Sequence, residues 1–189
     1  MTNVPGRELE IALRRPLDLP TTLGPLAHGR GDRTIRLTRT EAWLAFRTDD
    51  GEATLRVTLG SPRHVRAVAW GPGADVALTG TPALVGELDD PDALVARHPV
   101  LRRLQRTNPG LRLPRSGRIF QALVPAVLEQ KVTGTEAFRT YAALLRSLGE
   151  PAPGPGAELG LRLPPSAERI AGLPYHAFHP FGLERRRAD

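Results

Sequence analysis

The feature that most constrains the fold is a turn, Asp49-Asp50-Gly51-Glu52, placed between two apolar segments. The segments 42–46 and 53–59 are rich in strand-forming residues, and an Asp-Gly turn between such segments is typical of a β-hairpin. Three further short segments alternate apolar and polar residues, as half-buried strands do; they are residues 9–13, 35–37 and 65–70. The first part of the chain is therefore expected to form an antiparallel sheet.

Helical patterns surround and follow these strands. A short helix is expected over residues 21–28, and a longer one over residues 74–86. Asp90 and Pro91 have the residue types of a helix cap and first helical position, so a helix interrupted at Pro99 is expected to continue to about Arg106. Helices that cover one face of an antiparallel sheet define an α+β unit. We assign residues 1–106 to this N-terminal domain.

The remainder, residues 107–189, is expected to be a helical domain. Ser116 is the expected cap of a helix with one apolar stripe and an internal Pro125. Thr135 is the expected cap of a second helix, which Gly149 ends. A loop over residues 150–156, a short helix over 167–171, a turn over 175–179 and a helix start over 184–189 complete the expected elements.

Charge is distributed unevenly along the chain. Residues 1–92 carry a net charge of −2, whereas residues 93–189 carry +8. No acidic residue occurs from Ala93 to Leu128, yet seven arginines do, at positions 97, 102, 103, 106, 112, 115 and 118. Such asymmetry is typical of a protein that binds a polyanion, foremost nucleic acid. The alternative explanation is that an arginine-rich chain simply uses arginine to solvate its helices.

Composition argues against several other classes of protein. No segment approaches the roughly 20 apolar residues of a membrane-spanning helix, and residues 1–10 do not resemble a signal peptide. The chain has no cysteine, which fits a reducing cytoplasm. Its five histidines show no metal-ligand spacing. We expect a cytoplasmic protein with no metal and no membrane partner.

Two motifs carry a resemblance to a known family. Pro109-Gly110-Leu111-Arg112-Leu113-Pro114 precedes the first helix of the second domain, and Gln130-Lys131-Val132-Thr133-Gly134 follows it. This arrangement resembles the alkylation-repair DNA glycosylases of the helix-hairpin-helix superfamily, of the bacterial 3-methyladenine DNA glycosylase II type. The match is strongest over residues 109–149, and weaker similarity covers nearly the whole chain. The resemblance implies an α+β front end followed by the first part of an all-helical glycosylase domain.

The resemblance also implies how duplex DNA is contacted. Such enzymes rotate the damaged base out of the stack and fill the gap with a side chain. In this chain the wedge turn is implied to be Gln130, Lys131, Thr133 and Gly134. Lys131 departs from the family, which carries an apolar wedge there, and a solvated helix end is the alternative. Backbone contacts are expected from a basic face of Arg112, Arg115 and Arg118.

The pocket that the resemblance implies also departs from the family pattern. Where the family has an aromatic residue that stacks on the alkylated base, this chain has Pro25. Tyr175 and Phe178 are possible substitutes by residue type. Their spacing is equally that of ordinary core residues, and we expect them in the core.

The family's phosphate-binding hairpin and catalytic Asp have no match within these 189 residues. Pro153-Gly154-Pro155-Gly156 has proline where an amide donor is needed, and Asp189 is no candidate. We therefore expect the chain to belong to a longer, monomeric, monofunctional glycosylase and to be inactive alone, with no catalytic residue of its own. The resemblance further implies that such an enzyme needs no cofactor and is associated with the nucleoid. A non-catalytic DNA-binding or regulatory remnant is the alternative, and an unrelated α+β interaction module is a weaker third possibility.

Overall fold

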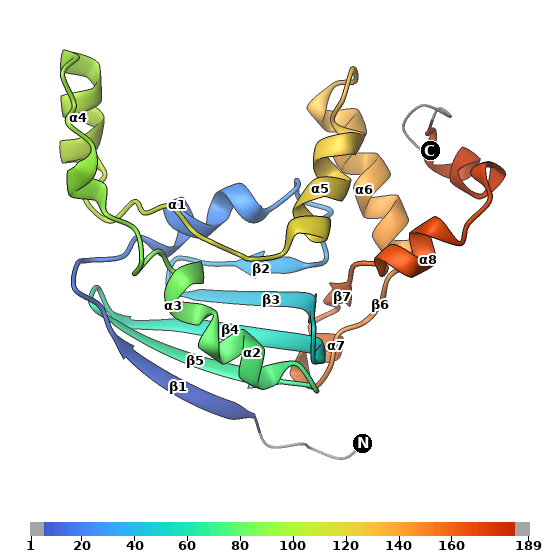
Figure 1. Cartoon of the computed structure of the whole chain (residues 1–189), viewed down its shortest axis with the longest axis horizontal. Helices are drawn as coiled ribbons and strands as arrows, with labels where there is room; N and C mark the ends of the chain where they lie inside the picture. Colours follow the sequence, from blue (N-terminus) through green and yellow to red (C-terminus); the bar gives the residue numbers. More distant parts are fainter. Residues whose placement is uncertain (1–5, 184–189) are drawn as a thin grey trace.

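The structure, a computed structural model, describes residues 6–183 and contains the expected antiparallel sheet (Figure 1). Its strands pair in the order β1-β5-β4-β3-β2, and every neighbouring pair is antiparallel. Each strand predicted from the sequence is present. The strands are β1 (Arg7–Ala12), β2 (Ile35–Leu37), β3 (Glu41–Thr48), β4 (Gly51–Ser61) and β5 (His64–Trp70).

The hairpin that joins β3 to β4 forms where the turn signal predicted it. Thr48 pairs with Gly51 across a turn made by Asp49 and Asp50. Gly51 has a φ of +118°, a conformation that L side chains rarely adopt. A Cβ atom there would also lie 2.9 Å from Cβ of Pro72. The turn therefore needs glycine for two independent reasons.

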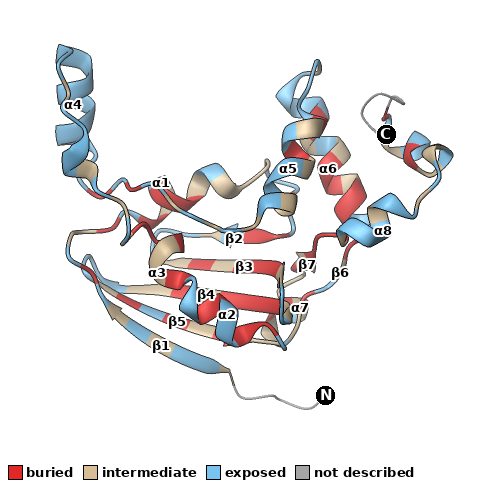
Figure 2. Ribbon diagram, in the orientation of Figure 1, coloured by how far each residue is buried: buried red, intermediate tan, exposed pale blue. Residues whose placement is uncertain are grey.

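One face of the sheet is covered by short helices, and the main apolar core lies between them (Figure 2). These elements are α1 (Leu19–Leu23), the 3-10 turn η1 (Gly24–Leu26), α2 (Ala74–Thr79) and α3 (Thr81–Leu84). Gly80 divides the predicted helix 74–86 into α2 and α3, because it caps one helix and precedes the other. The expected α+β class is confirmed.

The predicted helix 91–106 is wrong in its first half. Only a 3-10 turn, η2 (Pro91–Ala93), forms there, and α4 (Pro99–Thr107) begins eight residues later than expected. Pro99 is the first residue of α4 rather than an interruption, since the residue before a proline avoids the α-helical conformation and His98 is extended. Every residue of α4 is exposed, and the helix stands away from the sheet (Figures 1 and 2).

Helices α5 (Ile119–Leu128) and α6 (Gly134–Leu148) pack together, but two predicted caps are wrong. Arg118, not Ser116, precedes α5, and Thr133, not Thr135, caps α6 by accepting a hydrogen bond from the Glu136 amide at 3.3 Å. A second apolar cluster lies beside this pair; it contains Leu128, Tyr141, Leu145, Phe178 and Leu183. Phe178 is thus a core residue, as expected.

After α6 the chain returns to the sheet. The elements are β6 (Glu150–Pro151), α7 (Pro155–Glu158), β7 (Arg162–Leu163), α8 (Ala167–Ala171) and the 3-10 turn η3 (Tyr175–Phe181). The segment 150–156, predicted to be a flexible or extended loop, is extended at its start: β6 pairs with β7, and the segment covers Ala45 on the other face of β3. Capping of α8 by Ser166 is as expected.

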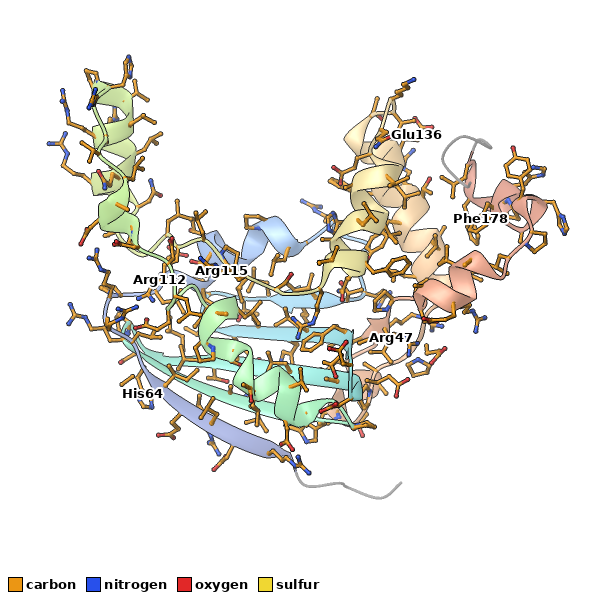
Figure 3. The ribbon with its side chains drawn as sticks, in the orientation of Figure 1. Arg47, His64, Arg112, Arg115, Glu136 and Phe178 are labelled. Carbon is orange, nitrogen blue, oxygen red and sulfur yellow. The ribbon has the colours of Figure 1, made fainter. Side chains whose placement is uncertain are left out.

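Contacts between distant segments fix this return. The Thr54 hydroxyl donates to the Pro153 carbonyl at 2.7 Å, and Arg47 forms ion pairs with Glu52 at 2.8 Å and Glu150 at 3.0 Å. Figure 3 shows Arg47 at this junction. The division at residue 106 stays a prediction. The predicted helix start at 184–189, including Asp189, lies outside the described residues.

Candidate functional site: a polar pocket and an exposed turn

The Pro-Gly-Leu-Arg-Leu-Pro motif holds the connection between the two halves against α1. The Asp18 amide donates to the Gly110 carbonyl at 2.8 Å, and a Cβ atom on Gly110 would lie 2.6 Å from that amide nitrogen. The Thr22 hydroxyl also donates to the Gly110 carbonyl and accepts from the Arg112 amide, both at 3.3 Å. The motif therefore positions the start of α5 relative to the sheet.

Arg112 lies inside this connection, and its predicted place on an exposed basic face is wrong. It is 4% exposed and pairs with Glu87 at 2.7 Å. Its guanidinium also donates to the carbonyls of Arg15 and Pro16. Figure 3 shows Arg112 and Arg115 along this connection. Because its donors bind protein groups, Arg112 has a structural role.

The predicted wedge residues lie together at the exposed turn between α5 and α6. Gln130, Lys131, Thr133 and Gly134 are all exposed. Lys131 has a φ of +60° and is the one non-glycine residue with positive φ among residues 6–183. A non-glycine residue in this region costs free energy and is found more often at functional sites. The turn thus presents Lys131 in a fixed, strained backbone conformation.

A side-chain contact connects this turn to the loop after η1. Nδ1 of His28 lies 3.4 Å from Oε1 of Glu129, the residue directly before Gln130. The His28 ring also meets the Tyr141 ring edge-on, with centroids 5.4 Å apart. A Cβ atom on the next residue, Gly29, would lie 2.8 Å from the Phe138 ring. The end of α5 is therefore held against the N-terminal domain.

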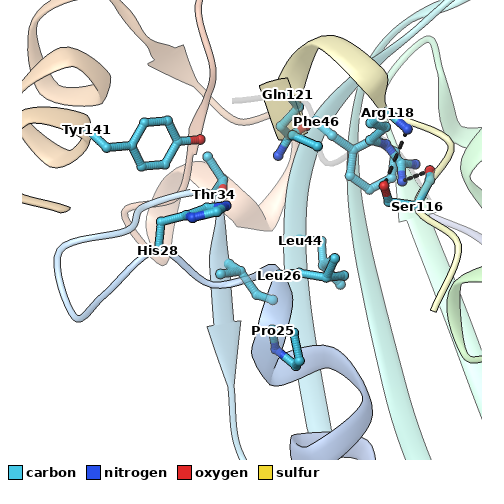
Figure 4. Close-up of a pocket in the computed structure, with 12 residues that line it drawn as sticks. Pro25, Leu26, His28, Thr34, Leu44, Phe46, Ser116, Arg118, Gln121 and Tyr141 are labelled. Atoms are coloured by element: carbon cyan, nitrogen blue, oxygen red, sulfur yellow. Dashed lines mark hydrogen bonds between the residues drawn. The ribbon is translucent and has the colours of Figure 1, made fainter. Parts of the chain in front are cut away.

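A cavity of about 140 Å³ lies between the loop that contains His28, strand β3, and helices α5 and α6 (Figure 4). It has a mixed lining of apolar and polar side chains. The residues labelled in the figure are Pro25, Leu26, His28, Thr34, Leu44, Phe46, Ser116, Arg118, Gln121 and Tyr141. A cavity of about 150 Å³ is known to hold one benzene ring. The space is thus of the size that admits a single aromatic ring.

Three buried polar atoms in this lining have no hydrogen-bond partner among the described residues. They are Nε of Arg118, Oε1 of Gln121 and the hydroxyl of Tyr141. Each unpaired buried group costs roughly 1–3 kcal/mol, so such groups are uncommon in folded proteins. Their occurrence in one cavity indicates a ligand site.

Arg118 is held in the cavity wall by the aromatic ring of Phe46. Its guanidinium carbon lies 3.0 Å from the ring centroid, and Nη1 donates to the Ser116 carbonyl at 2.8 Å. Burial lowers the pKa of Arg118 to about 9, so the side chain stays cationic at neutral pH. Arg118 therefore brings a positive charge to the cavity instead of extending into solvent.

Tyr141 stays protonated at neutral pH. Burial raises the pKa of its hydroxyl, and the charge of Asp32 adds to the increase. The nearby Thr34 hydroxyl offsets part of this shift without reaching hydrogen-bond geometry. Tyr141 can thus donate a hydrogen bond into the cavity.

Of the three predicted basic-face residues, Arg115 alone is exposed. Its backbone amide donates to the Ala83 carbonyl at 3.0 Å, which fixes its position between α3 and α5. Exposed cations also line α4, at Arg102, Arg103 and Arg106. Helix α4, which carries these three arginines, and the α5–α6 turn, which carries Lys131, project from the same side of the molecule (Figure 1).

Sequence patterns did not identify most of the cavity. His28, Phe46, Gln121 and Tyr141 come from four separate segments that only the fold brings together. Pro25 was singled out and does line the cavity. Arg118 and Gln121 are close in sequence, but Arg118 precedes α5 in a non-helical conformation, so no helical spacing marked the pair.

Residues 6–183 contain neither a membrane-spanning helix nor a cluster of metal-binding side chains. No helix there is long and apolar enough to cross a membrane. No cluster of three or more His, Cys, Asp or Glu side chains there has the arrangement of a metal site.

The sequence matches no protein-family profile and no curated protein, but the structure resembles solved structures of DNA glycosylases. A 3-methyladenine DNA-glycosylase from Archaeoglobus fulgidus aligns with a TM-score of 0.74 and 17% identity over 95% of this chain. MBOgg1, in complex with a low-affinity DNA ligand, aligns with a TM-score of 0.68 and 13% identity over 99%. An 8-oxoguanine glycosylase/lyase from Clostridium acetobutylicum aligns with a TM-score of 0.66 and 11% identity over 100%.

These similarities show the fold, which is that of DNA glycosylases. The chain covers 63% of the Archaeoglobus protein, 62% of MBOgg1 and 64% of the Clostridium protein. It therefore spans less than two thirds of the length of each neighbour.

Proposed function

We propose that this chain is the base-recognition and duplex-opening part of a DNA glycosylase of base-excision repair. The observation that carries the proposal is that an exposed turn and a polar cavity adjoin the same helix, α5, and that His28 lines the cavity and contacts Glu129 directly before the turn. Gln130 and Lys131 enter the gap in the base stack, and the base that leaves it enters the cavity beside Gln121. Along α5, Gln121 of the cavity and Gln130 of the turn are nine residues apart, a span of roughly 14 Å.

Affinity for the duplex comes from exposed cations. Arg115, Lys131 and the arginines of α4 contact phosphates, which gives sequence-independent and salt-dependent binding. The partner is double-stranded DNA because the wedge needs a base stack to enter. The complete protein acts as a monomer, associated with the nucleoid in the cytoplasm.

The substrates are damaged bases, and the sequence resemblance points to alkylated bases of the 3-methyladenine type. Support for a glycosylase comes from the fold and from the cavity's unpaired polar groups. The chain lies within a monofunctional, cofactor-free enzyme of the helix-hairpin-helix superfamily, whose catalytic Asp it does not supply.

The second candidate is a non-catalytic DNA-binding remnant of such an enzyme. The exposed arginines favour this second candidate equally, because contacts with phosphates require no catalysis. The two candidates differ in whether the cavity is used: a remnant that contacts only the backbone makes no distinction between intact and damaged duplex.

Equilibrium binding tests the proposal. The chain is titrated by fluorescence anisotropy with an intact duplex and with one that carries a tetrahydrofuran gap. We expect affinity for both to fall steeply between 50 and 200 mM salt, as it does when several phosphates are contacted, and the gapped duplex to bind about tenfold more tightly. Equal affinities at every salt concentration support the remnant, and no affinity even at low salt contradicts both candidates. Release of alkylated bases is assayed with the complete reading frame.

A further inference from the structure

The α5–α6 turn is held from the loop after η1 by the side chain of His28. Resting on the proposed function, we propose that His28 is a positioning residue for the turn: through Glu129 it fixes the backbone that presents Gln130 and Lys131. The turn then enters the base stack without first having to be ordered. In this role His28 acts on the turn and not on the base. The inference gives this loop, which no sequence pattern marked, a part in duplex opening.

Lys131 needs support from its surroundings, because its φ of +60° is unfavourable for a residue with a side chain. Such strained conformations persist only where neighbouring contacts fix them. On the α6 side, Thr133 caps the helix by accepting from the Glu136 amide at 3.3 Å. On the α5 side, Glu129 follows the last helical residue, and its Oε1 is 3.4 Å from Nδ1 of His28. The two contacts therefore flank Lys131 and hold the turn from both sides.

His28 can serve as a fixed point because its own loop is held in place. Its backbone amide donates to Oδ2 of Asp32 at 2.9 Å, and Oδ1 of the same carboxylate accepts from the amide and hydroxyl of Thr34. A Cβ atom on Gly29 or on Gly31 would lie 2.8 Å from a side-chain atom of α6, so the loop packs closely on that helix. Loop and helix thus form one unit, from which His28 extends to the end of α5.

The His28 ring is oriented by aromatic side chains of α6. It meets the Tyr141 ring edge-on with centroids 5.4 Å apart, and the centroid of the Phe138 ring lies 6.4 Å away. Figure 4 shows the His28 and Tyr141 rings. The His28 side chain is 22% exposed, so its contact with Glu129 is screened less by water than a fully exposed one. A carboxylate only accepts hydrogen bonds, so this contact requires the hydrogen on Nδ1.

Two measurements test this role, one with DNA and one without. Anisotropy gives the ratio of affinities for the tetrahydrofuran-gapped and the intact duplex. Digestion with endoproteinase Lys-C reports how often the turn opens, because Lys131 is the single lysine of the chain and proteases cleave segments that open locally.

His28→Phe keeps an aromatic ring and removes the donor. We expect it to lower the ratio about fivefold and to speed cleavage after Lys131 about fivefold, which is the order of effect of one hydrogen bond. Affinity for the intact duplex should change little, since the contacts with phosphates remain.

Matched variants separate this contact from a general loss of structure. Glu129→Leu removes the contact at an exposed position and should act like His28→Phe, so it serves if His28→Phe lowers the melting temperature. Glu129→Gln keeps an acceptor oxygen and should keep both readouts at wild-type values. Loss of this carboxylate raises affinity for both duplexes alike, so the ratio is the quantity compared.

His64→Phe is the matched control. Nε2 of His64 is also 3.4 Å from a carboxylate oxygen, Oε2 of Glu10, but this pair lies on the sheet, away from the turn (Figure 3). The same substitution there should leave both the ratio and the cleavage rate unchanged.

The outcomes separate this inference from the proposed function. A wild-type chain with no preference for the gapped duplex would contradict the proposed function, whereas faster cleavage of His28→Phe would still support its hold on the turn. Unchanged cleavage in both His28→Phe and Glu129→Leu overturns the inference, whatever the duplexes show. A wild-type preference that both variants retain, or equal losses in Glu129→Gln, overturns the inference alone.

Discussion

Replacing Arg112 by Ala is expected to lower the free energy of unfolding by about 3–5 kcal/mol, the usual cost of removing one partner of a buried ion pair. The loss leaves the Glu87 carboxylate, which is 13% exposed, without its closest partner. It also leaves the Arg15 and Pro16 carbonyls without their donor. Urea unfolding followed by circular dichroism measures the change. Arg115→Ala is the control, since an exposed arginine should change stability by less than about 0.5 kcal/mol.

The cost of Arg112→Ala should depend on pH. Burial alone would raise the pKa of Glu87, but hydrogen bonds from Arg112 and Arg14 outweigh it and hold the pKa below its ordinary value of 4.5. A lowered folded-state pKa stabilises the protein above the unfolded pKa, and this contribution is lost as the pH falls through the folded pKa. The difference between wild type and variant should therefore be largest near pH 7 and shrink below pH 4.5. An equal difference at pH 7 and pH 3 would contradict this role of the pair.

Replacing Lys131 by Gly is expected to reduce the preference for a gapped duplex about tenfold, because the aliphatic stem that enters the base stack is lost. Folding should suffer little. The φ of +60° at this position is unstrained for glycine, which offsets the greater flexibility of glycine in the unfolded chain. Anisotropy with intact and gapped duplexes measures the ratio.

A second substitution separates the stem of Lys131 from its charge. Lys131→Leu keeps an apolar stem and should retain the preference for the gapped duplex while binding both duplexes less tightly, since one phosphate contact is lost. If Lys131→Leu and Lys131→Gly lose the preference equally, Lys131 acts through its charge and the turn is not a wedge.

The strands and the two central helices were predictable because their signals are local. The alternation of apolar and polar residues around Asp49–Gly51 reflects contacts that repeat at a fixed spacing along a strand, and the apolar stripe of α5 does so along a helix. The caps were less predictable: Thr133 and Thr135 are both suitable residue types, and the packing of the α5–α6 turn decides between them. Pro99 was expected to interrupt a helix but begins one instead, since proline's fixed φ and missing N–H suit the first helical position.

The candidate site was predictable only in part. The turn at Gln130 and Lys131 was found through the family resemblance, and the structure places both side chains in solvent. Arg112 was misassigned because a basic segment does not reveal which arginine faces an acid such as Glu87, 25 residues away in sequence. The cavity went unrecognised as a whole because Phe46 and Tyr141 meet there only after the sheet and helices pack. Non-local contacts of this kind leave no periodic pattern.

The most direct test of the central claim is whether this chain extrudes a base. A duplex with 2-aminopurine at a central mismatch is titrated with the chain, because the fluorescence of this base is quenched by stacking in a duplex. Our account predicts a saturable, several-fold rise in fluorescence with wild type and a much smaller rise with Lys131→Gly. Saturated binding, shown by anisotropy, with no rise in fluorescence would mean that the duplex is held but not opened, and would contradict the account.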